Sequence, residues 1–335
     1  YDAANDKYNG YVQSKPSRIS NYTSYNDRLT FQAHLLYDRL IADKHKIGVT
    51  LVYEQQQNWS RVSSLAREYT FFTNDQINQA DLNNQKANGY ENETASKSYI
   101  GRFNYDYKGR YFLEYAFRYD GSYRYHPDRR WGFFPVVSGG WRVSEEQFMK
   151  PVSFISHLKL RASYGLVGED AGLPFQYVPG FSTSGGGGYE FADGTYTTGA
   201  SSPAVTNENL TWFKSTISDI GIELSLLGKI NFELDVYQRY RKGLLARRNV
   251  SLPNTFGSTL PEENINSDLV RGIDFSIGYQ HNTGAFHYGI KGNFNFARTM
   301  NRYVERGAFL NSMDRWRSGA SDRWSDVVWG YKLEG

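Results

Sequence analysis

The sequence predicts an all-β fold: part of an antiparallel, up-and-down transmembrane β-barrel of about ten strands, with short periplasmic turns and long extracellular loops. Three observations predict it. Apolar and polar residues alternate over about ten residues at a time, as they do in a strand whose two faces meet different surroundings. Short and long connections follow one another between these runs. Aromatic residues make up 16% of the chain, and many tyrosines stand where a run ends.

The clearest alternation lies between residues 98 and 168. Tyr99–Tyr107 and Arg110–Asp120 each place Tyr, Phe or Leu on one side and Arg, Asn, Glu or Asp on the other. Only Lys108-Gly109 separates them, so the two strands must pair antiparallel. After a polar loop at 121–130, further runs follow at Val136–Val143 and 158–166. A segment that can begin one helical turn, at 144–147, connects these last two runs.

Six other runs complete the expected set, at residues 29–38, 46–54, 220–226, 230–236, 273–279 and 286–296. Short turns are expected near Asp43-Lys44, at Leu227-Gly228-Lys229 and at Asn282-Thr283-Gly284. Residues 1–27, 55–95, 168–210 and 245–267 lack the alternation, and we expect loops there. The pattern is also lost beyond Arg302.

A membrane explains these features with one cause. A transmembrane β-strand needs about 9–11 residues, and only a closed barrel satisfies all strand backbone groups within hydrocarbon. The Tyr/Phe/Leu face would then meet lipid, and the charged face would line a wet lumen. The tyrosines at the strand ends, which would form interfacial girdles, are Tyr37, Tyr53, Tyr107, Tyr119 and Tyr279. A large soluble β protein with aromatic cross-strand pairs is the alternative, and strand length and loop alternation favour the barrel.

Composition excludes several classes of protein. The 38 basic and 35 acidic residues are spread along the chain, so nothing predicts nucleic-acid binding. The absence of cysteine excludes disulfides and thiolate sites. No apolar window approaches the ~18 residues of a transmembrane helix. Because the chain starts with neither an initiator Met nor a signal peptide, we expect a fragment or a mature chain.

The sequence predicts no enzyme, no cofactor and no metal site. The six histidines lack paired metal-ligand spacing, Gly185–Gly188 lacks the Lys-Ser/Thr of a phosphate loop, and no Gly-x-Ser-x-Gly occurs. The adjacent carboxylates Glu169-Asp170 and the acidic, Asn-rich stretch 74–92 fit solvated surface better than a glycosidase or calcium site.

Several segments resemble the central barrel of the SusC/RagA family of TonB-dependent outer-membrane transporters. They follow the family's order, and the stretch from the first to the last spans about two-thirds of the chain. These segments are Gly101–Tyr105, Tyr119–Ser122, Arg130–Pro135, Gly140–Ser144, Leu158–Gly165, Asn207–Trp212, Asn264–Gly272 and Trp329–Tyr331.

The resemblance implies active import of a large nutrient, a glycan or a peptide, across the outer membrane of a Bacteroidetes-type bacterium. It implies energy from a TonB complex and a SusD-type surface lipoprotein as a lid. Such barrels have ~22 strands and a plugged lumen. We therefore expect residues 1–335 to be one arc of the barrel domain, without the N-terminal plug, the TonB-contacting segment and the final strands.

Five aromatic residues are expected in the outer loops: Trp59, Tyr189, Phe191, Tyr196 and Trp212. They could stack on a substrate, touch the lid lipoprotein or pack the loops together. Two other functions stay open: a passive porin or structural surface barrel, which would need no plug, and a soluble carbohydrate-binding β domain, which would fold without detergent.

Overall fold

A computed structural model describes residues 17–69, 74–181, 188–192, 194–200, 205–249, 253, 256–284 and 286–328. The stretch 329–331 and most of 185–188 lie outside these residues. The chain forms two compact units. The larger contains Gln32–Glu54 and Ser96–Gly335, and the smaller contains Tyr1–Phe31 and Gln55–Ala95.

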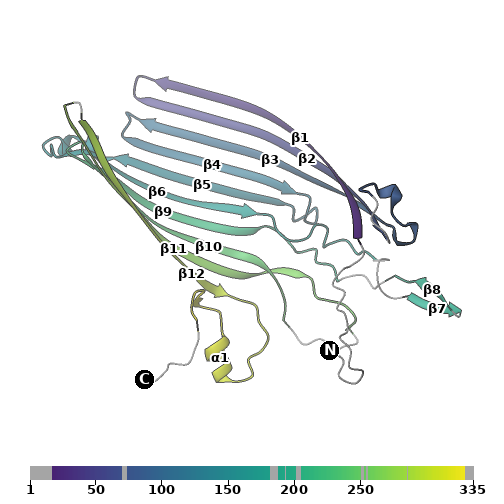
Figure 1. Cartoon of the computed structure of the whole chain (residues 1–335). Helices are drawn as coiled ribbons and strands as arrows, with labels where there is room; N and C mark the ends of the chain where they lie inside the picture. Colours follow the sequence, from purple (N-terminus) through teal and green to yellow (C-terminus); the bar gives the residue numbers. More distant parts are fainter. Residues whose placement is uncertain are drawn as a thin grey trace, which may run out of the picture. The chain divides into compact units, whose positions relative to one another are not determined.

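Eleven strands form one sheet in the order β1-β2-β3-β4-β5-β6-β9-β10-β11-β12-β13 (Figure 1). Their bounds are β1 (Ser17–Ile41), β2 (His45–Tyr69), β3 (Lys86–Tyr107), β4 (Tyr111–Ser122), β5 (Trp131–Arg142), β6 (Ile155–Glu169), β9 (Phe213–Leu226), β10 (Ile230–Arg247), β11 (Glu262–Thr283), β12 (Phe286–Tyr303) and β13 (Arg323–Trp324). Strands β7 (Gly188–Ala192) and β8 (Thr195–Thr198) form a separate hairpin. The all-β, antiparallel prediction is confirmed, and the sheet is open between β1 and β13, as an arc of a barrel would be.

Very little of the described chain is helical. Two 3₁₀ turns, Val143–Glu145 and Gln147–Met149, follow β5 where one helical turn is predicted. The α-helix α1 spans Ser312–Ser318 and is capped by the Asn311 side chain, which accepts a hydrogen bond from the Asp314 amide. In the described residues we find no helix with the length and apolar character that a membrane crossing needs.

The tight turns adopt the backbone conformation that their sequences predict. Lys108 and Gly109 have φ of 54° and 65°, and Leu227 and Gly228 have φ of 52° and 64°. Two successive positive φ values define a type I′ turn, whose twist matches that of the paired strands. Ala42 and Asp43, between β1 and β2, follow the same rule.

The loop boundaries predicted from the sequence are wrong in four places. β1 already begins at Ser17, β2 continues to Tyr69, and β3 begins at Lys86. β10 and β11 extend into the stretch 245–267, and the stretch 168–210 contains the β7–β8 hairpin. Alternation marks only the part of a strand whose faces meet different surroundings. Backbone pairing continues where the residues on the two faces no longer differ regularly in polarity, and alternation cannot show it.

The strand register places the two classes of residue on opposite faces. One row across β6, β9, β10, β11 and β12 is apolar, and the adjacent row is polar. The first row is Leu160, Ile222, Leu234, Phe275 and Phe294, and the second is Arg161, Gly221, Asp235, Asp274 and Asn295. No second sheet covers the apolar face in the described residues, and Ile220 there is 66% exposed. This arrangement excludes a stacked sandwich.

The aromatic residues near the turns are offset along the sheet. Trp141 on β5 is in register, strand by strand, with Phe294 on β12. β12 begins at its turn with Phe286 and Tyr288, which lie nearer the turn than Phe294. Such an offset is expected where tilted strands cross one interfacial girdle at different points of their register.

Candidate functional site

The polar face carries a ladder of ion pairs between strands that are not all neighbours. Arg161 on β6 contacts Asp235 on β10 at 2.6 Å, across the intervening strand β9. The residue between them is Gly221, where a Cβ would clash with both the Asp235 carboxylate and the Arg161 guanidinium. Glycine therefore leaves room for the two side chains to meet across β9. Glu223 joins the ladder through Lys159 at 3.4 Å and Arg161 at 3.5 Å.

A shallow hollow of about 560 Å³ lies beside this ladder on the same face. Small residues from β2, β5 and β6 contribute to its lining, including Gly48, Ser138 and Ser163. Charged side chains complete it, among them Arg102, which pairs with Glu114 at 2.7 Å. Among the described residues, no group of three or more histidines and carboxylates could hold a metal ion.

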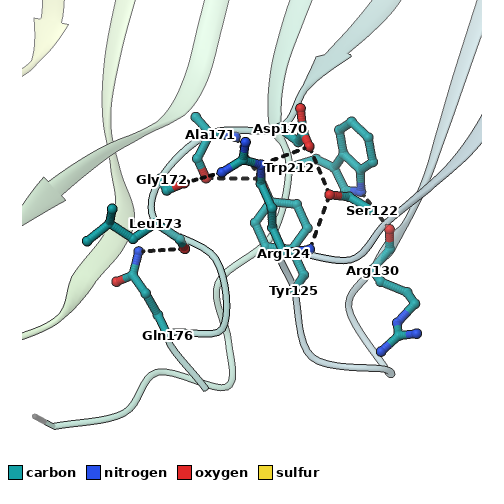
Figure 2. Close-up of polar contacts among 10 residues, drawn as sticks. All are labelled: Ser122, Arg124, Tyr125, Arg130, Asp170, Ala171, Gly172, Leu173, Gln176 and Trp212. Atoms are coloured by element: carbon teal, nitrogen blue, oxygen red, sulfur yellow. Dashed lines mark hydrogen bonds and ion pairs between the residues drawn. The ribbon is translucent and has the colours of Figure 1, made fainter. Parts of the chain in front are cut away.

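The loop ends of β4, β5, β6 and β9 meet in one packed junction (Figure 2). Tyr125, in the loop after β4, is 1% exposed, and its ring packs beside Trp212, which precedes β9, at 5.9 Å. The ring of Phe134 on β5 packs edge-to-face against the same indole, with ring centroids 5.3 Å apart. A Cβ on Gly168 would lie 1.8 Å from the Phe134 ring, so β6 needs glycine beneath it. We call this group of residues, together with the polar contacts below, the outer junction.

Hydrogen bonds fix the loop after β6 to the loop after β4. The Ala171 amide donates to the Tyr125 hydroxyl at 3.0 Å. Arg124 pairs with Asp170 at 3.2 Å and donates to the Gly172 carbonyl at 2.6 Å, and Ser122 donates to Asp170 at 2.8 Å. Burial raises the pKa of Tyr125 to about 12, so its hydroxyl stays protonated at neutral pH.

A second set of contacts joins the two ends of the segment that carries β7 and β8. The Asn207 amide donates to the Gln176 carbonyl at 2.9 Å. The Gln176 side chain donates to the Glu262 carboxylate at 3.0 Å, and the Asn207 side chain donates to the Glu262 carbonyl at 2.6 Å. Asn264 exchanges hydrogen bonds of 2.8 and 2.9 Å with the Thr211 backbone. The segment between residues 176 and 207 is therefore attached at both of its ends to Glu262, the first residue of β11.

The structure separates the five predicted aromatic residues into three environments. Trp212 lies within the outer junction, where its indole N–H donates to the Arg130 carbonyl at 2.9 Å. Trp59 lies in strand β2 rather than in a loop, half-buried against Tyr25. Tyr189, Phe191 and Tyr196 lie on the β7–β8 hairpin and are 67%, 75% and 65% exposed. The structure does not bring the five together, and their contact with a substrate stays a prediction.

Reasoning from alternation missed the residues that build the outer junction. Tyr125, Gln176 and Glu262 lie in stretches without periodicity, and they act through partners that are distant in the sequence. The available signal was the resemblance, because Arg130–Pro135, Asn207–Trp212 and Asn264–Gly272 all contribute to the junction.

Comparison with known proteins agrees with this architecture. Residues 1–334 match the family described as TonB dependent receptor-like, beta-barrel. The chain is 35% identical over 228 residues to TonB-dependent receptor SusC of Bacteroides thetaiotaomicron, covering 67% of this chain and 21% of SusC. It is 30% identical over 278 residues to TonB-dependent receptor P39 of Formosa agariphila, covering 80% of this chain and 25% of P39.

Among solved structures, the RagAB peptide transporter superposes with a TM-score of 0.72 at 20% identity, covering 88% of this chain and 32% of the matched chain. This likeness shows the fold. The chain spans between a fifth and a quarter of the length of the two curated relatives named above. It belongs to the TonB-dependent receptor-like β-barrel family, as a homologue of SusC and a part of an outer-membrane barrel.

Proposed function

We propose that this chain is a sector of the wall of a SusC/RagA-type active transporter that imports a glycan or a peptide. One observation carries the proposal. The sheet has a continuous apolar face for lipid and, one residue away on every strand, a polar face bearing ion pairs for a wet lumen. Membership of the TonB-dependent family and the similarity to SusC support active rather than passive passage.

In this proposal the described sheet is one arc, and strands from the rest of the protein close the barrel. A plug in the lumen and a TonB-contacting segment would couple the barrel to energy from the inner membrane. A SusD-type lipoprotein would cover the outer end, where the long loops lie. The ladder of Arg161, Glu223 and Asp235 would line the path that the plug occupies and the substrate follows.

The aromatic residues of the outer end supply the contacts to substrate or lipoprotein. Tyr189 and Phe191 form an edge-to-face pair with centroids 5.0 Å apart on the exposed hairpin. Exposed aromatic rings of this kind stack on sugars or on apolar side chains of a protein partner. Trp59 and Trp212 are half-buried, so in this proposal they act mainly by packing.

The test uses the full-length protein in the outer membrane of a host whose TonB complex can be removed. Accumulation of fluorescent oligosaccharides or peptides is measured with and without TonB. We expect accumulation of one class that stops without TonB. Accumulation that continues without TonB identifies a passive porin, and a protein that folds as a soluble monomer without detergent identifies a soluble binding domain.

The contribution of the hairpin is tested in the same assay. Combined Tyr189→Ala, Phe191→Ala and Tyr196→Ala substitutions should raise the half-saturating substrate concentration or weaken lipoprotein binding, with folding unchanged. Leu310→Ala is the matched control, because Leu310 is 91% exposed and is not part of the hairpin. Equal effects of the two variants would show that the hairpin does not contribute to recognition.

A further inference from the structure

Two pairs of like charges lie directly opposite each other on the outward face of the sheet. Lys214 on β9 is in register with Lys242 on β10, and Arg271 on β11 is in register with Arg298 on β12. Both pairs lie on the same face of the sheet as the apolar residues. Residues an even number apart on a strand share a face, and Lys242 lies six residues after Val236 and Arg271 two residues before Ile273. Like charges directly across a strand pair destabilise a sheet unless something neutralises them.

Protein groups neutralise only one of the four cations. Arg298 pairs with Asp326 at 2.9 Å and stacks on Trp324. Within the described part of the chain, Lys214, Lys242 and Arg271 form no ion pair, and Arg271 only donates to the Gln238 side chain at 3.0 Å. The neighbouring outward positions hold Thr216, Ser218, Tyr240, Leu269 and Met300, with no carboxylate.

The height of these pairs is set by the apolar band. On β10 the outward residues from the turn are Ile230, Phe232, Leu234 and Val236, then Gln238, Tyr240 and Lys242. Tyr240 thus stands where the loop-side girdle belongs, with Lys242 just beyond it. On β11 and β12 the outward residue next after the apolar band, beyond Ile273 and Phe296, is Arg271 and Arg298, so the arginine pair also borders the loop side of the band, in register with Gln238 of β10. Lys97 on β3, in register with Gly121 and Trp131, occupies the equivalent place.

We infer that these outward cations form a binding site for the phosphate groups of anionic lipid in the outer leaflet. The long loops place this end of the barrel outside the cell, and the level just beyond the girdle is that of lipid head groups. A phosphate between Lys214 and Lys242 would neutralise both ammonium groups, and a second would bind Arg271, whose guanidinium suits phosphate oxygens. The inference rests on the lipid-facing assignment and not on what is transported.

The test titrates purified full-length protein in neutral detergent with bisphosphorylated lipid A and counts bound lipid by native mass spectrometry. The combined variant Lys214→Gln, Lys242→Gln and Arg271→Gln should bind about a hundredfold more weakly, because the loss of each cation near a membrane surface weakens binding about fivefold. Lipid A without its phosphates should bind the unchanged protein as weakly. The matched control, Lys46→Gln, Arg239→Gln and Lys291→Gln, removes three charges from the polar face and should leave binding unchanged.

A single substitution gives a second readout that does not depend on the triple variant folding. Lys242→Gln relieves a like-charge pair, so the protein should unfold at an equal or higher temperature in phosphatidylcholine bilayers. In bilayers containing lipid A the same variant should unfold at a lower temperature than the unchanged protein. A shift of the same sign in both bilayers, or equal loss of lipid in the control variant, would overturn the proposal. Inorganic phosphate that stabilises the protein as well as lipid A does would assign the site to a soluble anion and overturn it too.

Discussion

The apolar and polar rows of β9–β12, which we call the membrane band, and the outer junction are stabilised in different ways. In the band, Leu234 and Asp235 are neighbours whose types depend on which surroundings each face meets. Another apolar residue would serve at position 234. In the junction, Tyr125 is buried and bonded to the Ala171 backbone, and no other side chain has that shape and hydroxyl. The band should therefore tolerate changes within a class of residue, and the junction should not.

The largest effect is expected from a charge placed on the lipid side of the band. Leu234→Arg lies midway between the girdles of β10 and should cost about 2–4 kcal/mol of unfolding free energy in lipid. Leu160→Arg and Phe232→Arg lie nearer the turn-side girdle, so their costs should be smaller. Urea titration of the full-length protein in vesicles measures all three.

Ser276→Arg is the matched control for this experiment. Ser276 is directly beside Glu233 on the polar face, where an added cation meets water and carboxylates. It should cost little. Similar large costs for Leu234→Arg and Ser276→Arg would show that the sheet does not separate lipid from water.

In the junction, the largest effect is expected from removing the indole that its aromatic residues share. Trp212→Ala takes away contacts to Tyr125 and Phe134 and leaves the Arg130 carbonyl with only one of its two donors, the Ser122 amide. We expect a local destabilisation of about 2–3 kcal/mol, measured as faster hydrogen exchange at the loop ends of β4, β6 and β9. Phe191→Ala, on the exposed hairpin, should stay within about 0.5 kcal/mol.

The contrast between the two regions also explains what the sequence could predict. Alternation predicted all ten of the wide strands, their antiparallel order and the tight turns, because lipid and water impose a period of two on any strand between them. It could not predict the strand extensions, the β7–β8 hairpin or β13, where both faces meet similar surroundings. It also could not predict that Tyr125 reaches Ala171, because a single long-range contact leaves no periodic trace.

The ion pairs of the polar face could be predicted only in part. Alternation predicts that Arg161 faces the lumen, but it does not predict that Asp235 is its partner. Arg161→Leu should cost about 1–3 kcal/mol, because it leaves the Asp235 carboxylate without its cation. Adding Asp235→Asn should recover a substantial part of that loss, as a double-mutant cycle would show. Additive losses in the two variants would mean that the contact contributes nothing.

A smaller effect than that of Trp212→Ala is expected at neutral pH from Tyr125→Phe, which removes the hydroxyl's two hydrogen bonds to the Ala171 backbone, of 3.0 and 3.4 Å, and should cost about 1 kcal/mol. The distinguishing effect of this substitution appears at alkaline pH. The pKa of Tyr125 is about 12 in the folded protein, above the ordinary value of 10, so its stabilisation is complete below pH 10 and is lost as the pH rises through 12. The difference in tyrosinate absorbance between the unchanged protein and Tyr125→Phe should show one group titrating near pH 12. Titration near pH 10 would contradict its burial.

The most direct test of the central claim is a cysteine scan of β10, in a full-length protein in which any cysteine outside this cysteine-free chain has been replaced by serine. Single cysteines are placed one at a time at Phe232, Glu233, Leu234, Asp235 and Val236 in the full-length protein in membranes, and a water-soluble maleimide is applied. We predict labelling at positions 233 and 235 and protection at 232, 234 and 236, with a lipid-phase quencher showing the opposite pattern. Uniform labelling along β10, or the reverse alternation, would contradict a sheet with lipid on one face and water on the other.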